Sequence, residues 1–252
     1  MKIIMNERKK AKEYLESGVI DNIIQCVYIL AKYYRTPSAT DDEIYNLINK
    51  FLETNFVGYK PDNWKSVIDY QIVKSKNHKL IEIDYIPITQ QEIETIESLK
   101  NNRLERLSFT MLVIAKYYNS INENNNNWVN RDFKSIFSLA NISVIKDKQC
   151  KMINILKDKK MIELSKKIDS LNLNIRYVDN ESEPIVVVRD IIDLGNQYNL
   201  LVKKDTKYKQ CKNCDRYIKA TKNKKYCKNC AIEMKRFVQR EWIRKKRAEK
   251  SI

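Results

Sequence analysis

Apolar residues recur every three or four positions through most of the chain, which is the spacing of helices that bury one face. In the middle of the sequence this pattern predicts helices over residues 104–118, 131–140 and 147–157. The asparagine-rich tract at 122–127 separates the first two, because asparagine side chains compete with helical hydrogen bonds. A short strand over residues 161–164 is expected after the third helix.

The third of these helices has one apolar and one polar face. Cys150, Ile153 and Leu156 are spaced so that they face the interior. The polar side chains on the opposite face are candidates for contact with a ligand: Lys148, Lys151, Asn154 and Lys157.

Further along, the pattern changes to the strict alternation that is typical of a half-buried strand. Apolar residues at every second position from Leu171 to Tyr177 predict one strand, and residues 185–188 predict a second. Residues 179–184 (DNESEP) have the composition of a turn, so we expect a β-hairpin. The turn carries three acidic side chains, which makes it a poor contact for phosphate groups.

Two stretches of the chain resemble each other, which indicates a duplicated unit. Residues 27–34 and 111–118 share the tetrapeptide Ala-Lys-Tyr-Tyr, and residues 79–83 resemble residues 160–164. The two offsets, 84 and 81 residues, are nearly equal and the matches occur in the same order. Chance similarity in a chain rich in Ile, Lys and Asn is the alternative explanation.

The first copy has a similar predicted order of elements. Helices are expected over residues 21–34, 41–54 and 62–74, then a strand over 79–85 and a connecting helix over 90–99. The third helix of this copy carries acidic as well as basic residues. This copy is therefore expected to contact a protein or to pack internally instead of binding DNA.

Three helices followed by a hairpin resemble the winged helix-turn-helix. The resemblance implies that the third helix, over residues 147–157, enters the major groove and that the wing touches the DNA backbone. Two such units in tandem are similar to the architecture of plasmid and phage replication initiators and of some transcription regulators, a likeness at the level of the fold alone.

Positive charge is concentrated at the C-terminal end of the chain. The whole sequence has 48 Lys and Arg against 32 Asp and Glu, a formal net charge of +16. Residues 203–252 hold 19 of the basic and five of the acidic residues, so they carry +14, and the first 202 residues carry +2. A polyanion, either nucleic acid or an anionic membrane surface, is the expected partner of this segment.

The same segment contains four cysteines in two CxxC pairs. Cys211 and Cys214 form the first pair, Cys227 and Cys230 form the second, and twelve residues separate them. This spacing predicts one structural Zn²⁺ ion in a closed tetrahedral site. A redox-active cysteine pair or an iron–sulfur cluster is the alternative. The twelve-residue gap is expected to form a short hairpin that returns the chain to the metal.

A basic helix is expected after the second pair, over residues 231–250. Met234, Val238 and Trp242 give it a narrow apolar edge, too narrow to favour binding to a membrane. Arginines line another edge, and arginine suits contact with phosphates and base edges. The layout resembles treble-clef or zinc-ribbon fingers, in which the second CxxC opens a helix. The candidate nucleic-acid contacts in this module are Lys219, Lys222, Lys224, Lys225, Arg236, Arg240, Arg244, Lys245, Lys246 and Arg247.

Several classes of protein are disfavoured by composition. Three glycines cannot build a glycine-rich phosphate loop, and a single histidine, His78, excludes multi-histidine metal sites. No clustered carboxylates indicate catalysis, so we do not expect an enzyme. No apolar run is long enough for a membrane span and no secretory signal is recognisable. We therefore expect the cytoplasm of a bacterial or phage-infected cell, in association with the nucleoid.

Together these patterns predict a mainly α-helical α+β protein with small β-hairpins. The expected parts are a helical lead-in (1–18), two winged-helix-like units (19–100 and 101–202) and a four-cysteine zinc module with a basic helix (203–252). The expected function is DNA binding, as a transcription regulator or replication initiator of a phage, plasmid or other mobile element. An RNA-binding factor, or a non-enzymatic protein that docks on host machinery through residues 19–100, is the alternative.

Overall fold

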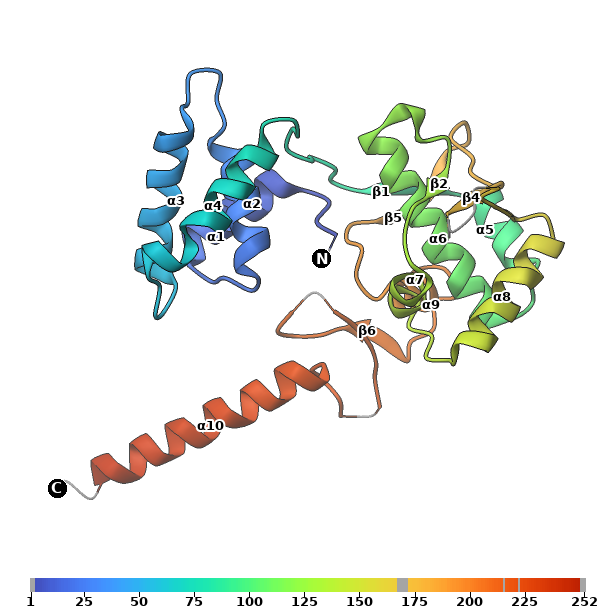
Figure 1. Ribbon diagram of the computed structural model, residues 1–252. Helices are drawn as coiled ribbons and strands as arrows, with labels where there is room; N and C mark the ends of the chain where they lie inside the picture. The colour runs from blue at the N-terminus through green and yellow to red at the C-terminus, as the bar shows by residue number, and fades with distance from the viewer. Residues whose placement is uncertain (1–2, 167–171, 215, 222, 250–252) are drawn as a thin grey trace. The chain divides into compact units, whose positions relative to one another are not determined.

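A computed structural model describes residues 3–166, 172–214, 216–221 and 223–249, apart from most side chains beyond residue 239 (Figure 1). Within that part of the chain the fold is mainly helical, with small antiparallel sheets, as expected. The chain forms two compact units, Met1–Tyr85 and Ile86–Ile252. The division falls after residue 85, whereas the sequence pattern indicated a boundary after residue 100.

The first unit is a helical bundle around one apolar core. Thr40 and Glu43 form a reciprocal capping box at the start of its third helix, and Pro61 begins its fourth. The largest side chains of the core are almost fully buried, among them Tyr14, Leu30 and Leu52. The three helices predicted for this unit are confirmed. Its four helices are α1 (Glu7–Ser17), α2 (Ile23–Tyr34), α3 (Asp41–Asn55) and α4 (Pro61–Ser75).

The strand predicted over residues 79–85 is wrong except at one position. Glu82 forms an isolated antiparallel bridge with Asn6. Around it, the Glu7 N–H donates to the Ile81 carbonyl at 2.7 Å and the Ile83 N–H donates to the Met5 carbonyl at 2.9 Å. The segment thus pairs with the N-terminal chain of its own unit and does not act as a free strand.

The second unit is built around one long helix, α6. This helix buries side chains on most of its circumference, including Phe109, Met111 and Ile114. Such all-round burial requires neighbours on several sides, and the remaining elements supply them. The four-cysteine segment 203–252 is called the metal module below. The elements before it are β1 (Ile86–Thr89), α5 (Gln90–Glu97), α6 (Asn102–Ile121), β2 (Trp128–Val129), α7 (Phe133–Leu139), α8 (Lys146–Asp158), β3 (Ile162–Leu164), β4 (Leu173–Ile175), β5 (Pro184–Val188) and α9 (Leu194–Leu201).

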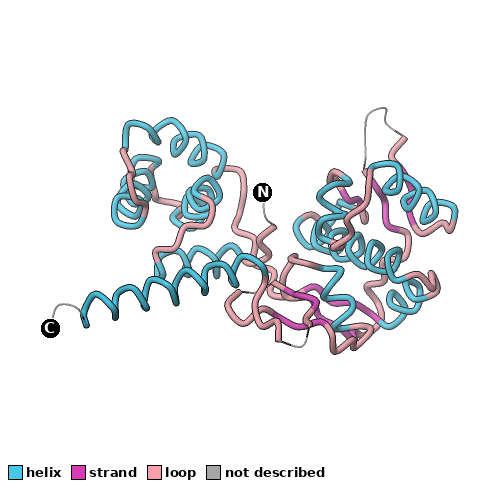
Figure 2. The backbone as a smooth tube through the Cα atoms, turned by 90° about the horizontal axis from the view of Figure 1, so that it is seen from below, coloured by secondary structure: helices cyan, strands magenta, loops and turns pink. Residues whose placement is uncertain are grey.

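A three-stranded antiparallel sheet closes one end of the α6–α8 helices (Figure 2). The strand order is β2-β4-β3, so the last strand in sequence lies in the middle. Ile162 is opposite Ile175, and both side chains join the core beside Ile136 and Leu156. Residues 165–172 connect β3 to β4, and residues 167–171 of this connection lie outside the described part.

The hairpin predicted over residues 171–188 is wrong. Strand β4 pairs with β2 and β3, while β5 pairs with β1, which lies almost 100 residues earlier in the chain. In that second sheet Ile86 is opposite Val188 and Ile88 is opposite Val186. Alternation identified residues 173–175 and 185–188 as strand, but it carries no information about which partner a strand chooses.

A buried ion pair connects α5, α6 and the segment between β4 and β5. Glu92 on α5 is fully buried, and Lys116 on α6 donates to its carboxylate at 2.7 Å. The Lys116 Nζ also donates to the Asp179 carbonyl at 2.8 Å, and the Asp179 N–H donates back to Glu92 at 2.8 Å. Glu92 additionally completes a capping box with Thr89. One carboxylate therefore fixes the ends of β1, α6 and the chain between β4 and β5.

Cys26 and Cys150 lie in different environments, and the sequence pattern predicted burial for Cys150. Cys26 is fully buried on α2, and burial raises the pKa of its thiol to about 12. Cys150 is exposed on α8, so that prediction is wrong. In α8 the buried positions are Ile153 and Leu156, and Cys150 lies outside the face that they form.

The metal module completes the second unit with two strands and the last helix. They are β6 (Tyr208–Gln210), β7 (Tyr217–Lys219) and α10 (Lys228–Glu249). No helix in the described residues has the length and apolarity that crossing a membrane demands.

We expect the buried pair to dominate the stability of the second unit. Replacing Lys116 with Met leaves the Glu92 carboxylate buried without a cation, and this should lower the free energy of unfolding by about 3–5 kcal/mol. The matched control, Arg176→Met, breaks an ion pair whose side chains are about half exposed and should cost less than about 1 kcal/mol. Amide hydrogen exchange in α6 measures the loss of unfolding free energy in each of the two variants. Equal losses in the two variants would contradict this ranking.

Candidate functional site

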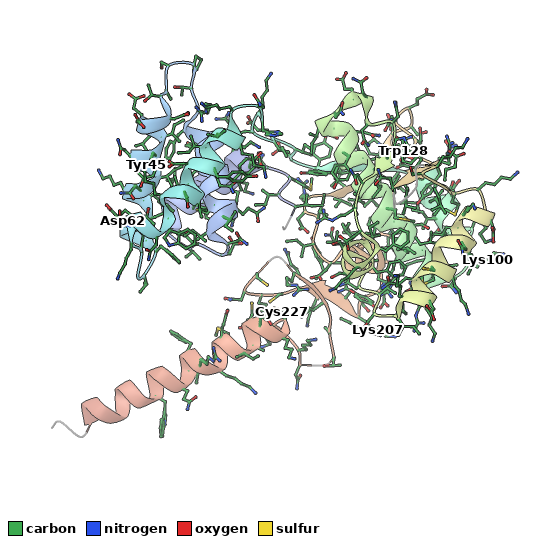
Figure 3. The ribbon with its side chains drawn as sticks, viewed as in Figure 1. Tyr45, Asp62, Lys100, Trp128, Lys207 and Cys227 are labelled. Atoms are coloured by element: carbon green, nitrogen blue, oxygen red, sulfur yellow. The ribbon has the colours of Figure 1, made fainter. Side chains whose placement is uncertain are left out.

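The four cysteines that the sequence singles out come together in one cluster. Their sulfur atoms all lie within 4.8 Å of one another, and the Sγ atoms of Cys214 and Cys227 are 3.8 Å apart. Four sulfurs at 2.3 Å from a tetrahedral ion would be separated by about 3.8 Å. The donor set and its spacing therefore fit one metal ion. Figure 3 places Cys227 at the start of α10, facing the small hairpin.

Each cysteine pair is positioned by a different element. Cys211 and Cys214 occupy the connection between β6 and β7, where the Cys211 N–H donates to the Arg216 carbonyl at 2.8 Å. The second pair marks the beginning of α10, with Cys230 in its first turn. The expected hairpin was placed between the two pairs. It is found instead around the first pair, because β7 (Tyr217–Lys219) pairs backwards with β6.

Backbone N–H groups point at the sulfurs. The Cys227 N–H donates to the Cys211 Sγ at 3.2 Å, and the Cys230 N–H donates to the Cys227 Sγ at 3.5 Å. Burial raises the pKa of the Cys211 thiol, but the N–H groups of Asn213 and Cys227 outweigh it and lower the pKa to about 6. For Cys214, burial raises the pKa to about 12. Four thiolates in this space repel one another, so the fully ionised cluster requires a cation.

The hairpin that carries the first pair is anchored to the body of the second unit by Arg216. Its Nε and Nη2 donate to the two carboxylate oxygens of Asp193 at 2.9 and 2.8 Å. The Asp193 carboxylate is almost completely buried and also accepts from Asn141 at 3.0 Å. Asn196 on α9 adds a bond to the Tyr217 carbonyl at 2.7 Å. The metal module is thus held at α9 by a fork-shaped ion pair.

Helix α9 is in turn fixed in the core. The Tyr198 ring lies 5.3 Å from that of Phe109, and its hydroxyl donates to the buried Glu105 at 2.9 Å. Gly195 allows α9 to approach α7 closely, since a Cβ there would lie 1.8 Å from the Ala140 carbonyl oxygen. No residue larger than glycine fits at this contact without movement of the backbone.

The candidate contacts on α8 lie on a different element from the cysteines. Lys148, Lys151, Asn154 and Lys157 are all exposed, as predicted. Lys148 and Lys151 also border a small cavity of about 230 Å³ between α8 and the start of α6, whose walls include Leu104 and Met152. The exposed face of α8 carries Asp147 and Asp158 as well, so its charge is mixed.

The basic residues of the metal module are exposed wherever their side chains are described. This holds for Lys219, Lys224, Lys225 and Arg236. Lys222 lies outside the described residues, as do the side chains of Arg240, Arg244, Lys245, Lys246 and Arg247, although the last five belong to α10. On the same helix Phe237, Val238 and Trp242 are more than half exposed.

Comparisons of the chain with protein-family models, with curated proteins and with solved structures give no match. The site therefore has to be interpreted from its own geometry.

The anchoring residues Arg216 and Asp193 had no signal in the sequence. Arg216 appears there as one more cation of a basic segment, and Asp193 precedes a helix that no pattern marked. Only the close approach of α9 to the hairpin shows that the two charges form a pair.

Loss of one cysteine of the cluster should disorder the module and leave the rest of the second unit folded. We expect Cys227→Ser to abolish stoichiometric metal binding and to expose the amides of β6, β7 and α10 to hydrogen exchange, because the thiolates nucleate this module. Cys150→Ser, at the exposed cysteine of α8, is the matched control and should change neither. Elemental analysis and amide exchange provide the two measurements. If the amides of β6, β7 and α10 stayed protected in Cys227→Ser although no metal was bound, the metal site would be contradicted.

Replacing Arg216 with Ala should separate anchoring from metal binding. The four ligands remain, so metal content should stay unchanged, but the nearly buried Asp193 loses its cation at a cost of about 1–3 kcal/mol. Amide exchange in β6 and β7 should accelerate roughly tenfold or more, and Arg216→Lys should restore part of the protection because it keeps the charge without the fork. Unchanged exchange in Arg216→Ala would refute the anchoring role.

Proposed function

We propose that the chain is a DNA-binding protein in which a zinc-stabilised basic module provides affinity and a winged-helix unit provides sequence recognition. The observation that carries the proposal is the cysteine cluster at the start of α10. It fixes the beginning of a 22-residue helix that holds eight basic and three acidic residues. Such a helix presents a high density of positive charge to a phosphate backbone.

Zinc is the metal that this donor set favours. Four thiolates in tetrahedral spacing leave no position for water or substrate, which is the arrangement of a structural zinc site. Cys211, Cys214, Cys227 and Cys230 would hold the ion, and its charge would balance the thiolates. An iron–sulfur cluster is the competing occupant, and it is distinguished by its visible absorption and by iron in elemental analysis.

The order of elements from α6 to β4 supports a winged-helix unit. The chain here has a helix, a short strand, two further helices and two strands, with the first strand beside the last, and this is the order expected of a winged helix. In that arrangement α8 is the proposed recognition helix, and the segment in the sequence position of a wing is the connection after β3, of which residues 167–171 lie outside the described part. This segment contains Lys166 and Lys167, and Lys167 lies outside the described residues.

The acidic turn at 179–184 no longer counts against DNA binding. It follows the middle strand of the sheet and does not form the tip of a wing. Its first residue, Asp179, accepts hydrogen bonds within the turn. These bonds, from Ser182 and Glu181, lower the pKa of Asp179 to about 2. In the proposed arrangement the acidic turn is therefore not the wing that would contact DNA.

The near-neutral first unit supports the additional proposal of a protein partner. Exposed apolar side chains lie on its helices and loops, among them Val57, Tyr70 and Val73. A body of this kind attached to a DNA-binding part is compatible with a transcription regulator or replication initiator of a mobile element. RNA binding is the alternative for the basic module, because phosphate contacts alone do not separate DNA from RNA.

Two pairs of substitutions should separate affinity from recognition. We expect Arg236→Ala with Arg240→Ala to weaken duplex binding at every sequence and to reduce the slope of log K against log salt by about two, one for each lost phosphate contact. Lys148→Ala with Lys151→Ala should mainly reduce the preference for a DNA sequence obtained by selection over other sequences. Lys50→Ala, at an exposed lysine of α3, is the control and should change neither.

Fluorescence anisotropy over a range of salt concentrations provides both quantities. The proposal fails if the α10 variant binds duplex DNA with unchanged affinity and slope. Competition among duplex DNA, single strands and RNA then decides the alternative: stronger binding of RNA than of duplex would favour the RNA-binding factor.

A further inference from the structure

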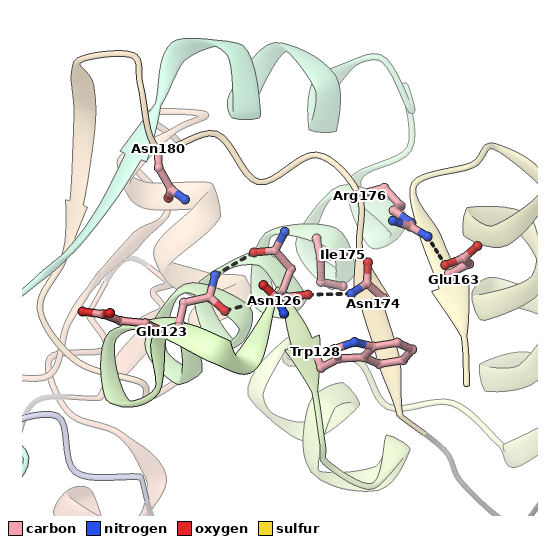
Figure 4. Close-up of a pocket in the computed structure, with 10 residues that line it drawn as sticks. Glu123, Asn126, Trp128, Glu163, Asn174, Ile175, Arg176 and Asn180 are labelled. Atoms are coloured by element: carbon pink, nitrogen blue, oxygen red, sulfur yellow. Dashed lines mark hydrogen bonds and ion pairs between the residues drawn. The ribbon is translucent and has the colours of Figure 1, made fainter. Parts of the chain in front are cut away.

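A polar cavity of about 760 Å³ opens on the second unit (Figure 4). Its size is in the range of sites for small organic ligands. Five asparagines and one tryptophan contribute to its lining, together with two glutamates and one arginine. None of these residues has a part in the functions discussed above.

The cavity lies against the outer face of the three-stranded sheet. Asn174 is opposite Trp128 on one side and opposite Glu163 on the other, so the three side chains share one face of the sheet. The opposite face carries Val129 and Leu173, which belong to the apolar core. Figure 4 shows Trp128 beside Asn174, with Arg176 turned towards Glu163.

The asparagine wall is held rigidly before any ligand arrives. Asn119 accepts from the Asn125 side chain at 2.9 Å and from the Asn127 N–H at 3.0 Å, and it donates to the Asn127 side-chain oxygen at 2.6 Å. Asn126 and Asn127 both have positive φ, at 49° and 65°, a conformation that asparagine tolerates better than most residues. This network organises the loop as one wall of a cavity.

Some of the amide groups in the wall remain without a protein partner. Asn174 is 94% buried; its Nδ2 donates to the Asn126 carbonyl at 2.7 Å, while its Oδ1 has no partner among the described residues. The Nδ2 of Asn127 also has no partner in the described part of the chain. These two groups line the same cavity, and an amide acceptor together with an amide donor would match the donor and acceptor edge of a ring such as a nucleobase.

The charge of the cavity selects a neutral ligand. Glu123 and Glu163 outweigh Arg176 among the lining residues, and Arg176 is already paired with Glu163. A phosphate inside the cavity would face net negative charge, whereas an aromatic base can stack on the Trp128 ring. We propose that this cavity binds a single unstacked nucleobase, whose sugar and phosphate stay outside. The base can belong to a free nucleoside or to a single strand.

This inference does not depend on the DNA-binding role of α8 and α10. A full chain with Trp64→Phe and Trp242→Phe retains Trp128 as its single tryptophan, whose fluorescence then reports on the cavity. We expect saturable quenching by adenosine, by AMP and by a short oligodeoxyadenylate, with little dependence on salt for adenosine. Tighter binding of the oligonucleotide that persists when Arg236→Ala and Arg240→Ala are added identifies a single strand as the source, and equal binding in that variant identifies a free nucleoside.

Substitution of Trp128 provides the second test. In an otherwise unchanged chain, Trp128→Leu should weaken binding of a labelled oligodeoxyadenylate by about tenfold or more, the loss that one stacked base predicts. Trp128→Phe should retain most of the affinity, and Trp64→Leu serves as the matched control in the first unit. Duplex affinity should stay unchanged in all three, so failure here is distinguishable from failure of the proposed function.

Circular dichroism establishes whether each variant is folded. Asn180→Ala, at the rim of the cavity, changes a lining residue that lies outside the sheet, so it tests the cavity without altering a strand. The proposal is overturned if the single-tryptophan protein shows no quenching with adenosine, AMP or the oligonucleotide. It is also overturned if a free hexose quenches and the three nucleobase probes do not, because the cavity would then be a carbohydrate site.

Discussion

The second unit depends on one buried charge pair, Glu92 with Lys116. Transfer of two charges into the interior is costly unless their remaining hydrogen-bonding positions are filled. Here they are: Thr89, Asp179 and the two side chains themselves supply the partners. The pair therefore determines where β1, α6 and the chain before β5 must lie, since any displacement would leave a buried charge unsatisfied. Apolar packing fills the volume, whereas this pair fixes the arrangement.

The first unit contains the same device, which gives the repeated tetrapeptide a physical meaning. Lys32 and Lys116 are the lysines of the two Ala-Lys-Tyr-Tyr segments, and both are buried against a glutamate that precedes them by 25 and 24 residues. In each unit that glutamate also accepts from the backbone of a segment far along the chain, at Ile81 in one and at Asp179 in the other. The shared ion pair supports a duplication and extends it beyond the segments that are similar in sequence.

Local patterns predicted local structure well and distant pairing poorly. Helical spacing located α2, α3, α4, α6, α7 and α8, and the CxxC spacing located the metal ligands, because both depend on a few neighbouring residues. The pairing of β5 with β1 depends instead on Glu92 and Lys116, which no short window of sequence contains together. The same holds for Arg216 and Asp193. The lysine of each tetrapeptide appeared as a polar interruption of an apolar helix, and its partner was needed to explain it.

The cysteine cluster bears on how α10 can be stable as a helix. Phe237 and Val238 are exposed, so these side chains of the described part of the helix bury little apolar surface, and an isolated helix of this length is marginal in water. Its excess of basic side chains adds repulsion along the whole length. Nucleation of the first turn is the costly step of helix formation, and a metal ion held by Cys227 and Cys230 would lie at that turn. Neutralisation by a polyanion would remove the repulsion that remains. On this argument a metal held by the cysteines would start the helix and a bound polyanion would complete it, while the near-neutral body has ion pairs of its own.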